Sequence, residues 1–244
     1  MNLAVSHVDF NYFCFPVLHD VSFQVDSGNL VCVLGSNGSG KSTLFKCILG
    51  LLRPQKGTIF LDGENIAAMP PRILAGKAAY IPQSQPGHFS YSALEIVLMG
   101  ATSGGGLFFS PGRKQEEQAV SALNQLGIEK LADRNFSHLS GGERQMVLIA
   151  RALMQQAKVL IMDEPCSNLD YGNQIRVMEC VKELARQGFL ILLATHNPEQ
   201  ALEYADLALV LSGGGVRCAG KAADILSDAL LEEIYGVKVK IRRN

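Results

Sequence analysis

One short stretch, GSNGSGKST at residues 35–43, constrains the fold of this chain more than any other. It fits the pattern G-x-x-x-x-G-K-[ST] and lies between a nearly continuous apolar run, NLVCVLG, and a segment with helical character that ends near Leu49. In that context the glycines let backbone N–H groups curl round phosphate oxygens at the positive end of a helix. We expect Lys41 to reach the terminal phosphates and Ser42 to bind Mg²⁺. The predicted phosphate-binding residues are Gly35, Ser36, Asn37, Gly38, Ser39, Gly40, Lys41, Ser42 and Thr43.

Three further stretches have the pattern of strands buried on both faces. They are AAYIPQ, KVLIMDEP and FLILLATH, and each precedes a helical or loop segment, which predicts a mostly parallel sheet with helices on its faces. The first thirty residues alternate polar and apolar positions and predict an antiparallel hairpin layer. Residues 84–157 have helical periodicity without buried strands. We therefore predict one α/β domain with a core at 1–83 and 158–225, an inserted helical subdomain at 84–157, and a C-terminal helix and tail at 226–244.

Composition narrows the classes of partner. The 22 basic and 23 acidic residues give a formal net charge of −1 and form no run of like charge, which argues against nucleic acid as the main partner. The six cysteines form no CxxC pair and no zinc-ligand spacing, as expected in a reducing cytosol. The longest apolar stretches fall far short of the ~20 residues that span a bilayer, and no signal peptide opens the chain. We expect a cytosolic protein.

Polar residues follow the predicted buried strands at their carboxyl ends, where open α/β sheets bind ligands. VLIMDE ends in Asp163 and Glu164, FLILLATH ends in His196, and AAYIPQ ends in Gln83. We expect Asp163 to hold Mg²⁺ through its hydration shell, Glu164 to act as a general base on the attacking water, and His196 to contact the γ-phosphate. Gln83 is either a ligand of Mg²⁺ or water, or an ordinary polar strand end.

A second glycine-containing stretch, HLSGGERQ, begins a predicted amphipathic helix. Ser140 and Glu143 have the spacing of a capping box, and capping alone does not ask for the two glycines between them. Gly141 and Gly142 remove side chains where the free N–H groups of a helix start point outward, which predicts a second anion cradle.

These motifs, in this order, resemble the nucleotide-binding subunit of ABC transporters over nearly the whole chain. GSNGSGKST looks like the Walker A loop, Gln83 the Q-loop, LSGGERQ the family signature, VLIMDEP Walker B, and His196 the switch histidine. SNLD resembles the D-loop and adds Asp170 to the predicted catalytic residues, although Cys166 and Asn168 depart from the commoner Thr and Ala. Tyr12 is similar to the aromatic residue that stacks on adenine, with Phe13 and Phe15 as alternatives.

The resemblance implies a P-loop NTPase core of RecA-like type and ATP with Mg²⁺ as ligands. It also implies a head-to-tail homodimer in which Ser140, Gly141 and Gly142 of one copy close over ATP bound to Walker A of the other. The dimer is expected at the cytoplasmic face of the inner membrane, as a peripheral ATPase that meets two integral membrane permease subunits through about 84–100. A substrate-binding protein would be an indirect partner.

FSYSALEIVLMG at 89–100 resembles the same segment in FecCD-type importers of iron-siderophore, haem and cobalamin. Import of metal chelates or corrinoids is therefore the predicted function. Importers of molybdate or of zinc and manganese are the alternatives within the family, and a soluble ABC clamp or scaffold is the alternative outside transport. A monomeric P-loop kinase would leave Gly141 and Gly142 unused.

Overall fold

A computed structural model describes residues 1–82, 90–104 and 112–236 of this chain. Its central sheet has the strand order β10-β9-β3-β8-β7-β6, in which β9, β3, β8, β7 and β6 are parallel and β10 is antiparallel to β9. The strands are β3 (Leu30–Leu34), β6 (Ala78–Ile81), β7 (Val159–Asp163), β8 (Leu190–Ala194), β9 (Leu207–Ser212) and β10 (Gly215–Lys221). The predicted mostly parallel sheet is confirmed.

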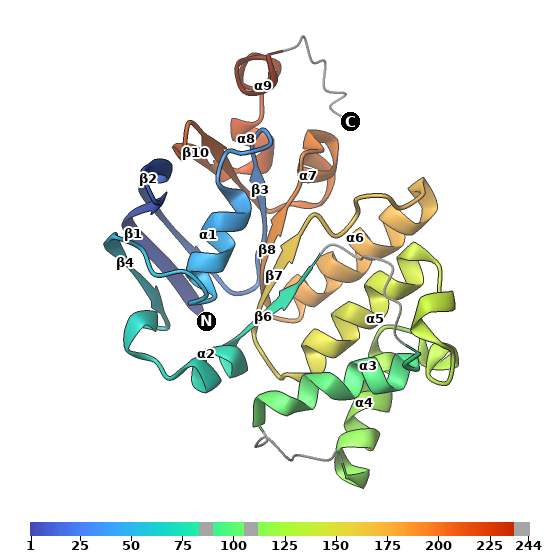
Figure 1. Cartoon of the computed structure of the whole chain (residues 1–244). Coiled ribbons are helices and arrows are strands. Elements are labelled where there is room, and N and C mark those ends of the chain that lie inside the picture. Colours follow the sequence, from blue (N-terminus) through green and yellow to red (C-terminus); the bar gives the residue numbers. More distant parts are fainter. Residues whose placement is uncertain (83–89, 105–111, 237–244) are drawn as a thin grey trace.

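A smaller antiparallel sheet covers one side of the molecule (Figure 1). Its order is β2-β1-β4-β5, and its strands are β1 (Asn2–Tyr12), β2 (Phe15–Asp26), β4 (Lys56–Leu61) and β5 (Glu64–Asn65). The alternating pattern of the first thirty residues correctly predicted its first hairpin, because β1 buries every second side chain over much of its length.

Helices cover both faces of the central sheet. Figure 1 shows α1 between the two sheets, and α5 and α6 on the other side of the central sheet. The helices are α1 (Lys41–Ile48), α2 (Pro71–Lys77), α3 (Ala93–Leu98), α4 (Arg113–Gln125), α5 (Gly141–Met154), α6 (Tyr171–Arg186), α7 (Pro198–Tyr204), α8 (Ala222–Ile225) and α9 (Asp228–Tyr235). Short 3-10 helices occupy Ile66–Ala68, Met99–Gly104, Glu129–Leu131 and Phe136–His138. None of the helices in the described ranges is long and apolar enough to cross a membrane.

The central strands are apolar throughout because they divide two hydrophobic cores. Along β3, Val31 and Val33 face the core shared with α1 and β1, whereas Cys32 and Leu34 face the core shared with α5 and α6. All five β3 residues are buried, so a polar side chain at any of them would lie in one of the two cores. This packing fixes the carboxyl ends of β3, β7 and β8 side by side.

Candidate functional site

The phosphate loop joins β3 to α1 at the carboxyl edge of the central sheet. Gly38 and Gly40 have φ values of +82° and +102°, in the left-handed region that glycine adopts at least cost. A Cβ on Gly35 would come within 2.5 Å of the Leu211 carbonyl oxygen, and one on Gly40 within 2.7 Å of the Leu18 side chain. The loop is therefore closed against β2 and β9, and side chains at these glycines would push it apart.

Two polar side chains of the loop are buried in a way that suits an anionic ligand. Lys41 is 6% exposed, and its Nζ donates to the carbonyl oxygens of Gly35 at 2.7 Å and Ser36 at 3.1 Å. Burial lowers the pKa of Lys41, against the opposing charges of Glu164 and Asp163. The Ser39 hydroxyl is buried and has no hydrogen-bond partner in the described structure. A phosphate oxygen would supply that partner.

Two carboxylates end β7 beside this loop. Asp163 Oδ2 accepts a hydrogen bond from the Tyr80 hydroxyl of β6 at 3.4 Å, and burial together with Asp163 raises the pKa of Tyr80 to about 12. Glu164 has a φ of +48°, which is uncommon for a residue other than glycine and turns the chain sharply after the strand. Strained backbone of this kind is frequent at functional sites.

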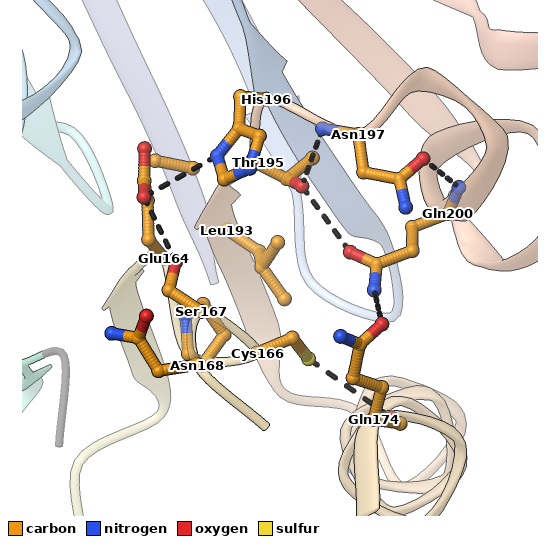
Figure 2. Close-up of a pocket in the computed structure, with 12 residues that line it drawn as sticks. Glu164, Cys166, Ser167, Asn168, Gln174, Leu193, Thr195, His196, Asn197 and Gln200 are labelled. Carbon is orange, nitrogen blue, oxygen red and sulfur yellow. Dashed lines mark hydrogen bonds and ion pairs between the residues drawn. The ribbon is translucent and has the colours of Figure 1, made fainter. Parts of the chain in front are cut away.

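Glu164 and His196 lie together, as Figure 2 shows. Glu164 Oε2 is 3.3 Å from His196 Nδ1 and accepts a hydrogen bond from Ser167 Oγ at 2.9 Å. The pairing follows from the sheet, because β7 and β8 are adjacent parallel strands and Asp163 is in register with Ala194. Two side chains that the sequence predicted separately are thus joined in one cluster, and Ser167 is an addition to it.

The start of α5 has the predicted cap and an unpredicted neighbour. Ser140 Oγ accepts from the Glu143 N–H at 3.3 Å, while Glu143 Oε2 accepts from the Ser140 N–H at 2.8 Å. A Cβ on Gly142 would lie 2.5 Å from Asn173 Cγ and Oδ1, and one on Gly141 would lie 2.8 Å from Leu169 Cδ2. Gly142 therefore lets α5 approach α6 closely, and Gly141 lets it approach the segment before α6, which is a reason for both glycines besides the predicted anion cradle.

The segment between β7 and α6 is held by Asp170 and shaped by Asn168. Asp170 is the N-cap of α6, and its two oxygens accept from the Asn173 backbone N–H at 2.9 Å and from Asn173 Nδ2 at 2.6 Å. The backbone hydrogen bond, above all, lowers the pKa of Asp170. Asn168 has a φ of +63°, a conformation that Asn tolerates better than Ala. Burial raises the pKa of the Cys166 thiol to about 12, so this thiol is not activated.

The aromatic residues at the tip of the β1–β2 hairpin differ in exposure. Tyr12 is 39% exposed and packs edge-on against Phe10, whereas Phe15 is 70% exposed and Phe13 is fully exposed. A pocket of about 330 Å³ lies between Pro16–Val17 of β2 and residues 36–39 of the phosphate loop, and none of these aromatic residues lines it. Gln83, the predicted Q-loop residue, lies outside the described residues.

Comparison with known proteins identifies the family. The model of the family described as "ABC transporter" matches residues 18–167, which is more than half of the chain. The chain is an ABC transporter ATP-binding domain. It therefore binds ATP and is an ATPase, as the motifs predicted.

Several relatives of this ATPase carry names that refer to import or transport. It is 37% identical over 229 residues to the hemin import ATP-binding protein HmuV of Agrobacterium fabrum, which covers 91% of this chain and 86% of the relative. It is 38% identical to an iron chelatin transport ATP-binding protein of Helicobacter pylori, over 86% of this chain and 84% of that one. Among solved structures, a metal-chelate type ABC transporter in an inward-facing conformation matches with a TM-score of 0.86 and 33% identity, over 97% of this chain and 89% of the other.

Sequence reasoning missed several polar residues around the ATPase site. Tyr80, Ser167, Gln174 and Gln200 all contact the segments that carry Asp163, Glu164 or His196. Ser167 opens the SNLD stretch that resembles the D-loop, so the sequence pointed to its segment but gave Ser167 no role. The two glutamines lie on amphipathic helices, where a glutamine usually marks the solvated face, so the sequence held no signal for them.

Proposed function

We propose that this ATPase uses Glu164 as general base, contacts the γ-phosphate through His196, and powers import of a metal chelate as a homodimer bound to a membrane permease. The observation that carries the catalytic part is the 3.3 Å contact between Glu164 Oε2 and His196 Nδ1, beside the phosphate loop. His196 and Ser167 both face the same carboxylate oxygen. Glu164 Oε1 has no hydrogen bond to a described residue, and we assign it to the attacking water.

Residues at the sheet edge also suit Mg²⁺. Asp163 ends β7, and Ser42 lies in the first turn of α1 with its side chain exposed. Carboxylate, hydroxyl and water oxygens are the ligands that Mg²⁺ prefers, and Mg²⁺ bound there would neutralise charge on the terminal phosphates. Lys41 would turn from the loop carbonyls to the same phosphates. The assignment of Gln83 to the ion or the water remains a prediction.

The position of the second cradle supports the proposed homodimer. Figure 1 places α1 and α5 on opposite sides of the central sheet, and the start of α5 packs on Leu169 and Asn173 of its own chain. The N–H groups of Gly141 and Gly142, together with the Ser140 hydroxyl, therefore suit a nucleotide held elsewhere, since the Ser140 N–H already donates to Glu143 Oε2. We assign that nucleotide to the phosphate loop of a second copy, with adenine stacked on Tyr12, which is anchored by Phe10, rather than on Phe13 or Phe15.

An apolar surface supports a membrane partner. A groove of about 620 Å³ runs between the end of α1 and α2, and its lining is mainly apolar. Leu51 is 67% exposed on this groove, and Ile73 of α2, Tyr91 and Met99 are other exposed large hydrophobic residues. We propose that permease subunits contact this surface together with residues 84–100. The names of the relatives favour haem or another iron chelate as cargo, over molybdate or zinc and manganese.

The variant Glu164→Gln tests the catalytic assignment. It should bind ATP but turn over at least ~100-fold more slowly, as expected for loss of a general base, and it should accumulate as an ATP-dependent dimer in size-exclusion chromatography. Turnover near that of the wild type would remove Glu164 from the mechanism. A variant that stays monomeric at saturating ATP would remove the homodimer.

Ser140→Arg tests the second cradle, and Ser92→Arg is its matched control. Ser92 and Ser140 make the same capping box, with hydroxyl contacts of 3.2 Å and 3.3 Å to the third residue of their helices. Ser140→Arg should bind ATP without dimerising or hydrolysing, whereas Ser92→Arg in the purified chain should do both. Equal loss in the two variants would show that only the helix cap matters.

Isolation of the native membrane complex tests the proposed partner and cargo. Isolation of the chain from its native membrane should bring an integral membrane protein with it, and Leu51→Asp should abolish that association without changing ATP binding. ATPase activity of the complex should rise with a binding protein loaded with haem or a ferric siderophore, and not with molybdate or zinc. Absence of any membrane protein would favour a soluble clamp.

A further inference from the structure

A chain of side-chain hydrogen bonds lies beside the Glu164–His196 pair (Figure 2). Thr195 Oγ1 donates to Gln200 Oε1 at 3.2 Å, and Gln200 Nε2 donates to Gln174 Oε1 at 3.0 Å. Gln174 Nε2 then donates to the Leu169 carbonyl oxygen at 2.9 Å. Each amide accepts through its oxygen and donates through its nitrogen, so both side chains have a fixed orientation.

The two ends of this relay are the two segments that carry the catalytic pair. At one end, Thr195 Oγ1 also accepts from the Asn197 N–H at 3.0 Å, which braces the turn that holds His196. At the other end, Leu169 is near the end of the segment that begins at Glu164 and leads to α6. Because Glu164 and His196 touch each other, the contacts form a closed ring from Glu164 through Leu169, the two glutamines and Thr195 back to His196.

The sheet joins these segments where they begin, because the Glu164 N–H donates to the Ala194 carbonyl oxygen at 3.1 Å, but packing does not fix the distance between them beyond that point. A pocket of about 290 Å³ separates them, and Glu164, Cys166, Gln174, Thr195, His196 and Gln200 are among the residues that line it. Side chains that meet across a cavity lack the close contacts that hold a dense core in one arrangement. The relay spans this space, so beyond the last hydrogen bond of the sheet it holds the turn at His196 against the segment after Glu164.

The relay also reaches the second cradle. Leu169 packs against Gly141, where a Cβ would come within 2.8 Å of Leu169 Cδ2. A shift of the Leu169 backbone would therefore press the Leu169 side chain against the start of α5. One end of the relay is thus coupled to the catalytic pair of its own chain, and the other to the glycines that are proposed to face the nucleotide of a second copy.

We propose that Gln174 and Gln200 are positioning residues for ATP hydrolysis, which hold His196 and Glu164 in register with the segment that supports Gly141. This inference rests on the proposed catalytic roles of Glu164 and His196. Neither glutamine lines the pocket beside the phosphate loop or is hydrogen bonded to that loop among the described residues. Their removal should lower turnover and leave the affinity for ATP unchanged.

The test compares Gln174→Leu, Gln200→Leu and the double variant in the purified full chain with Mg²⁺ and ATP. Each single variant should lower kcat about 10-fold with KM changed less than 3-fold, since small displacements of reacting groups cost large factors in rate. The double variant should be no slower than either single variant, because each change breaks the same relay. Gln174→Glu, which keeps the acceptor for Gln200 and loses the donor to Leu169, should behave like Gln174→Leu and serves if that variant fails to fold.

A surface pair of glutamines provides the control. Gln125 Nε2 donates to Gln187 Oε1, also at 3.0 Å, on the exposed side of α4 and at the end of α6. Gln125→Leu and Gln187→Leu should leave kcat unchanged. Wild-type kcat in the relay variants, or losses that multiply in the double variant, would overturn the proposal. Glu164→Gln, measured in parallel, separates the two failures: normal turnover there overturns the catalytic assignment, whereas an inactive Glu164→Gln beside normal relay variants overturns only the relay.

Discussion

Substitution of Gly142 by alanine separates two reasons for a glycine at the start of α5. A Cβ there would lie 2.5 Å from Asn173 Cγ and Oδ1 and 2.7 Å from Asn173 Cβ, whereas ordinary contacts begin at 3.4 Å. Asn173 cannot easily turn away, because its Nδ2 donates to Asp170 Oδ2 at 2.6 Å. To relieve this overlap, either Asn173 must leave its hydrogen bond to Asp170, or α5 and α6 must move apart until the contact reaches an ordinary distance.

The expected loss can be worked out from these contacts. Overpacking a close contact costs about 1–3 kcal/mol, and alanine regains up to ~1 kcal/mol over glycine in a helix. Gly142→Ala should therefore lower the free energy of unfolding by up to about 2 kcal/mol. Gly172 is the matched control, since it is also the second residue of a helix and its Cβ would meet Asp170 Oδ1 at an ordinary 3.5 Å. Gly172→Ala should be neutral or should stabilise by up to ~1 kcal/mol.

Urea unfolding followed by far-UV circular dichroism measures both variants, because the chain has no tryptophan to report unfolding by fluorescence. The pair Gly142→Ala with Asn173→Gly should recover part of the loss, since the second change removes all three crowding atoms. If Gly142→Ala stabilises the chain as much as Gly172→Ala does, close packing is not the reason for the glycine. The anion cradle would then be its only explanation.

Two further predictions concern single residues near the site. Asn168→Ala should lower the free energy of unfolding by about 1 kcal/mol, because alanine pays more than asparagine at a φ of +63°, while Asn168→Gly should change it little; equal effects in urea unfolding would contradict this. The hydrogen bond from the Ser140 N–H lowers the pKa of Glu143 below its ordinary value of 4.5. The ionised side chain therefore stabilises the fold above pH 4.5. This stabilisation is lost as the pH falls through the lowered pKa. Glu143→Gln should be less stable than the wild type at neutral pH and should approach it in acid; a gap that is the same at both pH values would rule out the linkage.

Motifs formed by neighbours in sequence were predictable. The phosphate loop, the buried strands around it and the capping boxes at Ser92 and Ser140 depend on backbone geometry within a few residues, so residue type and spacing are enough to indicate them. The order of β3, β8 and β7 in the sheet came only from the structure, but parallel strands present their carboxyl ends at one edge whatever their order. That rule placed Glu164 and His196 at the same edge, and the structure adds their contact.

The sequence by itself predicted a phosphate-binding loop rich in glycine and a second glycine pair at the start of a capped helix, and the structure confirms the cap. Only the tertiary structure decided what holds these parts in place: Asn173 against Gly142, Tyr80 on Asp163, and the relay through Gln174 and Gln200. The physical reason is separation along the chain. These partners are 26 to 83 residues apart, and an asparagine or glutamine on a helix has the same pattern in sequence whether it meets water or another segment.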